Sequence, residues 1–391
     1  MLNGSALASS AQKLFSALDE RRAGDLVKEV LATTGVTVNG SDPWDLIVHD
    51  ERLYTRIMRD GTLGFGEAYV EGWWDSPNLD QCMDRIFRAR LDHALRDNWV
   101  IIAHVVRAKL FNFQMTRPFE VAQKHYDIGN DLYEAMLDRR LVYTCAYWKD
   151  AKDLDAAQEA KLDLVCRKLG LHHKRGMKVL DLGCGWGGFA GYAAERYGAH
   201  VVGYTVSKEQ VALARERYAG LPVEFRLDDY RNATGTYDAV SSIGLMEHVG
   251  WKNYRGYMEL VDRCMAPDGV ALIHTISGTV TRNQLDPWFD KYVFPNAVFP
   301  SLGRLGHALE ELLVAEDLHN IGEHYDYTLM AWWERFDAAW PRLRARYGDS
   351  FYRLWKYYIL TSAGSFRSRS LNLFQLVMTR QGTKQPDCRQ V

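Results

Sequence analysis

The segment VLDLGCGWGGF, which begins at Val179, has the residue types and spacing of a nucleotide-binding turn. An apolar strand pattern carries an acid at Asp181, glycines follow at Gly183, Gly185 and Gly187, and a helical pattern comes next. Glycine lets the backbone bend sharply and come close to a ligand. A strand, a glycine-rich turn and a helix in this order predict a nucleotide-binding βα unit. The acid lies inside the motif, whereas in dinucleotide-binding proteins it follows the turn by about 20 residues.

The next two predicted strands end in polar groups that would complete such a site. Thr205 ends the second strand, and Ser207 and Gln210 follow it with the spacing of a helix capping box. The third strand ends in a pair of aspartates followed by Tyr230, and Asp229 is placed to accept a hydrogen bond from an adenine amino group. The same aspartate pair would also suit a solvent-exposed turn, and the residues alone leave both interpretations open.

Three further segments carry candidate chemistry, namely KHYDIGND from Lys124, YTCAYW from Tyr143 and MEHVG from Met246. Together with the glycine-rich turn, they resemble the cyclopropane-fatty-acyl-phospholipid synthases, a family of S-adenosylmethionine-dependent methyltransferases. The likeness runs from residue 40 to residue 380 and includes YDYTLMAW from Tyr325. It is greater for the bacterial phospholipid-acting branch than for the shorter mycolic-acid branch, which lacks the N-terminal domain.

The resemblance implies a specific reaction. The methyl group of S-adenosylmethionine would be added to a cis double bond in an unsaturated acyl chain of a membrane phospholipid, and loss of a proton would close the ring. The implied proton acceptor is a bound bicarbonate ion, held by Cys145, Glu247, His274, Tyr325 and the backbone of Ile276. Without the family, Cys145 would be interpreted as a small buried apolar residue and His274 as a core histidine.

The resemblance also implies a cofactor site and an assembly. S-adenosylmethionine would be bound by Tyr143, Thr144, Asp181, Gly183, Gly185, Gly187, Thr205, Gln210, Asp229 and Tyr230. The protein would be a cytoplasmic homodimer, associated peripherally with the inner face of the membrane and acting at the phospholipid bilayer surface. Ser362 stands where related sequences often carry a cysteine, so no thiolate chemistry is expected there. Two alternatives are a methyltransferase that leaves methyl-branched or methylene products and a lipid-binding homologue without catalysis.

These residues require a scaffold of alternating strands and helices. Strand patterns occur at 178–182, 200–205, 223–227, 237–243, 270–275 and 371–379, and helical patterns at 187–197, 207–218 and 251–265. The alternation predicts an α/β fold with a parallel sheet whose carboxyl edge binds the ligand. Together with the resemblance, it indicates the class I methyltransferase architecture, a Rossmann-like, seven-stranded, mostly parallel sheet.

We expect two domains. Residues 1–118 would form a smaller, mostly helical lipid- or membrane-binding domain, and residues 119–391 the catalytic domain, with a helical acyl-channel insertion at about 280–365. The basic and apolar segment from Arg85 to Lys109 would either dock on an anionic membrane or form a core helix with a charged outer face. The aromatic stretch from Pro287 to Pro295 would line the acyl channel or pack in a core.

The composition excludes several other classes of function. A net charge of −2 argues against a nucleic-acid partner. The six cysteines form no Cys-x-x-Cys pair, which predicts free thiols in a reducing compartment and no metal site. The first residues lack the apolar core of a signal peptide, and no run reaches the roughly 18 apolar residues of a membrane span.

Overall fold

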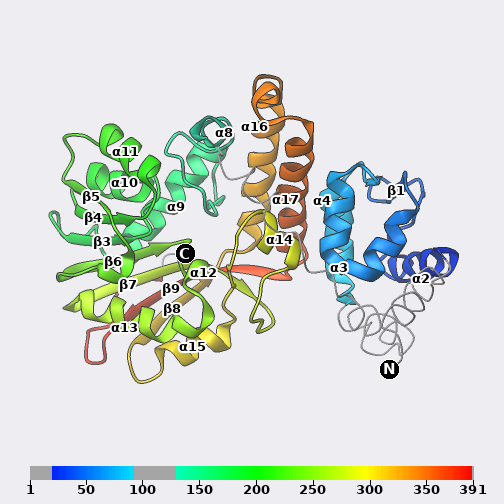
Figure 1. Cartoon of the computed structure of the whole chain (residues 1–391). Helices are drawn as coiled ribbons and strands as arrows, with labels where there is room; N and C mark the ends of the chain where they lie inside the picture. Colours follow the sequence, from blue (N-terminus) through cyan, green and yellow to red (C-terminus); the bar gives the residue numbers. More distant parts are fainter. Residues whose placement is uncertain (1–19, 92–128, 390–391) are drawn as a thin grey trace, which may run out of the picture. The chain divides into compact units, whose positions relative to one another are not determined.

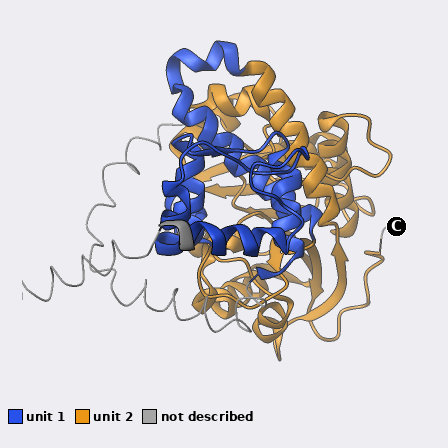
Figure 2. Cartoon of the chain, turned by 90° about the vertical axis from the view of Figure 1, so that its right-hand side faces the viewer, with its two compact units in different colours: residues 1–128, 286–295, 340–368 blue, residues 129–285, 296–339, 369–391 orange. Residues whose placement is uncertain are grey.

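The computed structural model describes residues 20–91 and 129–389, which fall into two compact units. Among these residues, unit 1 contains 20–91, 286–295 and 340–368, and unit 2 contains 129–285, 296–339 and 369–389 (Figure 2). Two segments of unit 1, residues 286–295 and 340–368, therefore come from the second half of the chain. The predicted domain boundary near residue 118 and most of the basic segment, residues 92–109, lie outside the described residues.

Unit 2 is built on a seven-stranded sheet within the described residues, with the strand order β5-β4-β3-β6-β7-β9-β8 (Figure 1). The strands from β5 to β7 are parallel to their neighbours, β9 is antiparallel to β7, and β8 is antiparallel to β9. Their bounds are β3 Lys178–Leu182, β4 His200–Thr205, β5 Val223–Leu227, β6 Tyr237–Ile243, β7 Met265–Gly278, β8 Val314–Asn320 and β9 Leu371–Thr379.

Helices cover both faces of this sheet because the buried strands are apolar on both sides. On one face, Val179, Val201 and Leu272 pack against α9, α10 and α11. On the other face, Leu180, Val240 and Ile273 pack against α13 and α15. The helical segments of this unit are α8 Asn130–Met136, α9 Leu154–Lys168, α10 Gly188–Tyr197, α11 Lys208–Arg217, η1 Tyr230–Asn232, α12 Met246–Val249, η2 Trp251–Asn253, α13 Tyr254–Cys264 and α15 Leu302–Leu309.

The predicted class I methyltransferase fold is confirmed. The six strands expected from the sequence occur, and five of them have the expected bounds; the sixth, expected at 270–275, is the longer β7. The sequence analysis missed β8, which lies inside the region expected to be helical. Most residues of β8 are exposed or half-buried, and the strand forms one edge of the sheet. An edge strand with a polar sequence carries little of the apolar pattern by which strands are recognised.

Unit 1 is mostly helical in the part of the chain that the structure describes. Helix α17 packs against α3 and α4, and α14 packs against α3. A Cβ atom on Gly364 of α17 would lie 2.8 Å from the carbonyl oxygen of Asp80 in α4, so glycine permits this close approach. The elements are α2 Glu20–Ala32, β1 Ile47–Val48, α3 Arg52–Val70, β2 Trp74–Asp75, α4 Leu79–Arg88, α14 Pro287–Tyr292 and α17 Asp349–Arg367, and the end of α16 Glu323–Tyr347 also belongs here.

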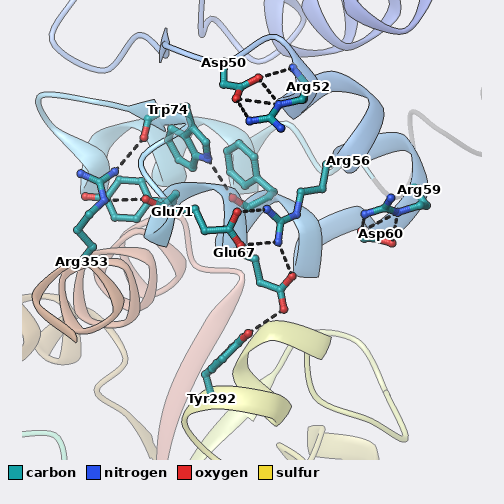
Figure 3. A network of polar contacts seen from close by, with 12 residues as sticks. Asp50, Arg52, Arg56, Arg59, Asp60, Glu67, Glu71, Trp74, Tyr292 and Arg353 are labelled. Atoms are coloured by element: carbon teal, nitrogen blue, oxygen red, sulfur yellow. Dashed lines mark hydrogen bonds and ion pairs between the residues drawn. The ribbon is translucent and has the colours of Figure 1, made fainter. Parts of the chain in front are cut away.

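A half-buried ionic network joins α3 to α14 within unit 1 (Figure 3). One oxygen of Glu67 accepts from Lys291 Nζ and from the Tyr292 hydroxyl, each at 2.7 Å. The other oxygen accepts from Arg56 at 2.7 Å, and the same guanidinium also bonds Glu71. None of the helices in the described residues is long and apolar enough to cross a membrane.

Candidate active site

The predicted site residues all belong to unit 2, and the glycine-rich turn is at its centre. Gly183, Gly185 and Gly187 have φ values of +77°, +54° and +80°, the left-handed region that favours glycine. A Cβ atom on Gly187 would also lie 2.6 Å from Cζ of Phe225, so a side chain has no room there. The turn leads directly into α10, and a Cβ atom on Gly185 would meet no atom within 4 Å, so the backbone is open at this position.

Asp181 lies in β3 beside this turn and is almost fully buried. Its Oδ1 accepts a hydrogen bond from Ser241 Oγ at 2.8 Å, and its Oδ2 has no partner among the described residues. Burial raises the pKa of Asp181 to about 7, against the hydrogen bond from Ser241 and the charge of Lys161, which lower it. The second carboxylate oxygen therefore has an unfilled capacity to bind a ligand donor.

The polar groups at the ends of β4 and β5 are held by short-range hydrogen bonds. Thr205 Oγ1 donates to Gln210 Oε1 at 2.8 Å, and Ser207 caps α11 as the capping-box pattern predicts. Asp229 caps the short helix η1 by accepting from the Arg231 backbone, and the paired guanidinium lowers the Asp229 pKa. Tyr230 packs its ring 5.6 Å from that of Tyr257. The turn role of Asp229 is thus observed, and its role toward adenine stays a prediction.

Glu247 follows the end of β6, and His274 and Ile276 lie on the neighbouring strand β7, where His274 pairs with Ile243, the last residue of β6. The backbone N–H of Ile276 donates to Glu247 Oε1 at 2.6 Å, and Glu247 Oε2 is buried without a partner among the described residues. Burial raises the pKa of Glu247 to about 7, although the Ile276 bond lowers it. The sequence analysis expected the Ile276 backbone to help hold bicarbonate; its N–H is bonded to the Glu247 carboxylate in this structure, and the role toward bicarbonate stays a prediction.

His274 lies on the sheet face covered by α9, because it follows Leu272 by two residues along β7. Its Nδ1 is 3.3 Å from Nε2 of Gln375, its cross-strand partner in β9, and its Nε2 is buried without a partner among the described residues. Burial holds the pKa of His274 well below its ordinary value, with a further contribution from the charge of Lys161, so the ring is neutral near pH 7. If the Gln375 amide donates to Nδ1, the ring proton is on Nε2.

Cys145 belongs to a loop that docks on the first turns of α16, the helix that carries Tyr325. The backbone N–H of Ala146 donates to Thr328 Oγ1 at 3.0 Å, and the N–H of Trp148 donates to His324 Nδ1 at 2.7 Å. Cys145 is fully buried, and burial raises the pKa of its thiol, so it is a neutral group here. Its Sγ lies 3.2 Å from the Ala146 carbonyl oxygen.

Ring contacts connect this loop to the sheet and involve Tyr143, a predicted cofactor-binding residue. The rings of Tyr143 and Tyr325 lie 5.0 and 6.0 Å from the ring of Trp332, between centroids. Tyr147 lies 6.0 Å from His319, which is the cross-strand neighbour of Gln375 on β8. Because Gln375 also pairs with His274 across β7 and β9, Tyr147 brings the loop of Cys145 to the sheet face that carries His274.

The sequence analysis missed two polar residues of α9, Gln158 and Lys161. Both are fully buried, and both bind the loop that carries Thr144. Gln158 Nε2 donates to the Thr144 carbonyl at 2.8 Å, and Lys161 Nζ donates to Thr144 Oγ1 at 2.9 Å. Their spacing of three residues puts them on one helix face, but a polar pair in a helix is usually solvent-exposed, and the pattern alone does not reveal its burial.

Comparison with known proteins agrees with this geometry. The family model described as mycolic acid cyclopropane synthetase matches residues 113–376. The chain belongs to this family. Cyclopropane-fatty-acyl-phospholipid synthase of Escherichia coli K12 is 45% identical over 356 residues, which cover 91% of this chain and 93% of that protein.

Two further similar proteins are a methyltransferase, matched by sequence, and a cyclopropane synthase, matched by structure. Tuberculostearic acid methyltransferase of Mycobacterium tuberculosis is 30% identical, with 96% of this chain and 93% of that protein covered. The crystal structure of the mycolic acid cyclopropane synthase CmaA1 with SAH and CTAB matches with a TM-score of 0.60 and 29% identity. It covers 66% of this chain and 96% of that chain. Family relatives thus include proteins named for ring formation and for methyl transfer.

Proposed function

We propose that this protein is a cyclopropane-fatty-acyl-phospholipid synthase. It would add the methyl carbon of S-adenosylmethionine to a cis double bond in a phospholipid acyl chain and form a cyclopropane ring. The observation that carries this proposal is the 45% identity over 91% of the chain to a protein of that name. The buried Glu247 and His274, in unit 2 with the glycine-rich turn, are chemical groups that suit such a reaction.

The residues at the carboxyl edge of β3 fit a bound S-adenosylmethionine. The backbone at Gly185 has open space beside it, and Asp181 keeps one carboxylate oxygen for a ligand donor. Tyr143, Thr144, Thr205, Gln210, Asp229 and Tyr230 complete the proposed site, as the sequence analysis expected. When bound, the sulfonium donor supplies an electrophilic methyl group. The role of these residues is to hold it close to the weakly nucleophilic alkene, since positioning lowers the barrier of such a step.

The groups around Glu247 fit a bicarbonate ion. Glu247 Oε2 and His274 Nε2 are buried and lack partners among the described residues, so both have capacity for a ligand. The bicarbonate hydroxyl would donate to Glu247, while His274 Nε2–H and the Tyr325 hydroxyl would donate to the anionic oxygens. Bound there, bicarbonate supplies a base for the proton that leaves the added carbon. Balance requires one alkene and one methyl donor, giving one ring, one S-adenosylhomocysteine and one proton for that base.

A phospholipid substrate implies a membrane surface. We propose that the protein associates peripherally with the inner face of the membrane and works as a cytoplasmic homodimer, with the N-terminal region 1–118 in contact with lipid. Arg85, Arg88 and Arg90 are the described basic residues of the expected docking segment. Anionic lipids attract such residues with about 1 kcal/mol each near the surface.

The experiment is a product analysis. Purified protein is incubated with vesicles of unsaturated phospholipid and methyl-labelled S-adenosylmethionine, with and without bicarbonate. We expect acyl chains that gain one CH2, carry the label and resist ozonolysis, in a reaction that slows when bicarbonate is removed. Labelled chains that ozonolysis still cleaves would support the alternative methylene product, which the likeness to tuberculostearic acid methyltransferase makes worth testing. Binding of S-adenosylmethionine without any labelled product would indicate a lipid-binding homologue.

A further inference from the structure

Lys161 is a buried cation that the proposed reaction does not yet use. It lies in α9 with no exposed surface, on the helix that covers the sheet face of Asp181 and His274. Its ammonium donates to Thr144 Oγ1 at 2.9 Å. No carboxylate of the described residues forms an ion pair with it, and the acids whose charges act on it are Asp138 and Asp181.

A buried ammonium with one hydrogen bond is costly, since a charge removed from water needs partners. Burial lowers the pKa of Lys161 to about 8, so the group is still charged near pH 7. The other buried lysine of α9, Lys168, instead has an ion pair with Asp317 at 3.0 Å. The two lysines therefore provide a contrast between a charge that is neutralised within the protein and one that is not.

The chemistry of an ammonium sets the direction of its bond to Thr144. An ammonium has no lone pair and can only donate, so Thr144 Oγ1 is the acceptor. The hydroxyl hydrogen of Thr144 must then point to a different acceptor, and none of the described residues supplies one. A hydroxyl that accepts from a cation is also a stronger donor, because hydrogen bonds in a chain polarise one another.

The rest of Thr144 is fixed from two other sides. Gln158 Nε2 donates to its carbonyl at 2.8 Å. Its methyl carbon Cγ2 packs against Gly244, which follows β6. A Cβ atom on Gly244 would lie only 2.6 Å from this carbon. The backbone, the methyl group and the acceptor side of the hydroxyl are thus all held, and only the direction of the O–H bond is left to a ligand.

We propose that Lys161 is a positioning residue that acts through Thr144 and aims its hydroxyl at a carboxylate-type anion bound at the carboxyl edge of the sheet. The inference rests on the proposed function and adds a residue to it. Two ligands of that reaction share this chemistry, namely the amino-acid carboxylate of the methyl donor and bicarbonate.

The test compares Lys161→Met, Thr144→Val and their double variant with the control Lys168→Met. Calorimetry measures the affinity for S-adenosylhomocysteine and for 5′-methylthioadenosine, which lacks the carboxylate, and activity is measured against bicarbonate concentration. A hydrogen bond to a charged group contributes about 1.5–3 kcal/mol, or roughly a 10- to 100-fold change in affinity.

If the methyl donor supplies the carboxylate, Lys161→Met and Thr144→Val each weaken S-adenosylhomocysteine binding by about tenfold or more and leave methylthioadenosine binding unchanged. If bicarbonate is the ligand, its half-saturating concentration rises by a similar factor and S-adenosylhomocysteine binding is unchanged. In both cases the double variant is no worse than the worse single variant. Thr144→Ser, which keeps the hydroxyl, restores most of the native affinity and covers the case in which Lys161→Met does not fold.

If Lys161→Met and Lys168→Met had the same ligand affinities and the same half-saturating bicarbonate concentration, the inference would be overturned and the proposed function would stand. Additive losses in the double variant would do the same, because they would show that Lys161 does not act through Thr144. Failure of the native protein to bind S-adenosylhomocysteine would overturn the proposed function together with the inference.

Discussion

The backbone N–H of Ile276 donates to Glu247 Oε1 across 2.6 Å and leaves the other oxygen of this buried carboxylate without a partner among the described residues. The carboxylate is thus held by one oxygen and offers the second in a known direction. A glutamine at this position could keep one acceptor oxygen but not two. The contact with Ile276 and the proposed contact with bicarbonate could then not both be made.

We therefore expect Glu247→Gln to lower kcat by about 10²-fold or more, because the variant would lose the bicarbonate that takes the proton, and a positioned base contributes at least this factor. His274→Ala and Tyr325→Phe should have similar effects, and S-adenosylhomocysteine should still bind to all three. Glu323→Gln, which alters an exposed residue of α16, is the control and should be fully active. Near-normal turnover in all three site variants would contradict the proposal that these residues hold bicarbonate.

The raised pKa of Glu247 predicts a pH dependence of stability. The folded protein holds the Glu247 proton up to pH about 7, whereas the unfolded chain releases it near 4.5. The stabilisation from the neutral form is therefore complete below pH 4.5 and is lost as the pH rises through 7. It amounts to about 3 kcal/mol, from 1.36 kcal/mol per pKa unit.

The side chain of the Glu247→Gln variant cannot ionise, so this variant should not show the loss of stability that Glu247 causes as the pH rises. Urea unfolding at pH 5 and pH 8 would show the variant gaining on the native protein at the higher pH. Equal differences between the two proteins at both pH values would contradict the shift.

The glycine-rich turn predicts that Gly187→Ala is far more damaging than Gly220→Ala. Both positions have positive φ values, +80° and +85°, which cost an alanine about 1–2 kcal/mol. Only at Gly187 does the added Cβ also meet a ring, that of Phe225 at 2.6 Å. We expect a loss of about 3 kcal/mol for Gly187→Ala, with weakened binding of S-adenosylhomocysteine. Equal stabilities of the two variants in thermal unfolding would show that the ring moves aside.

The ionic network of unit 1 predicts a contrast between Glu67 and Asp50 (Figure 3). Glu67 accepts from Arg56, Lys291 and Tyr292 in a half-buried setting, so Glu67→Gln should lower the free energy of unfolding by about 2 kcal/mol. Asp50 pairs with the exposed Arg52, and Asp50→Asn should have no measurable effect. Denaturant midpoints decide the matter, and an equal response to both changes would argue against the network.

The sheet of unit 2 could be predicted because its strands are buried on both faces and their apolar runs end at glycine or polar residues. The strand β8 could not be predicted, since VAEDLHN is mostly exposed and pairs only with β9. Strand ends also placed Asp181 and His274 at one edge. The distances from Cys145 to its partners in α16 depend on tertiary packing, and no spacing in the sequence encodes them.

Lys161 shows a different limit. In a helix, a lysine between apolar residues is normally taken for a solvated side chain. Its burial depends on which face of α9 turns toward the sheet and on Thr144, 17 residues earlier, which accepts a hydrogen bond from its ammonium.

The three separate stretches that build unit 1 have a practical consequence for anyone who trims this chain. Helix α17 buries Phe351, Leu354 and Tyr357, and it packs against α3 and α4 from the first hundred residues. A fragment starting at residue 129 would keep α17 but lose α3 and α4. The apolar face of α17 would then be exposed to solvent, and the fragment would tend to aggregate. The N-terminal and C-terminal halves of the chain are therefore not independent modules. A chimera that replaces the N-terminal residues of unit 1 must also redesign residues 286–295 and 340–368, which pack with them.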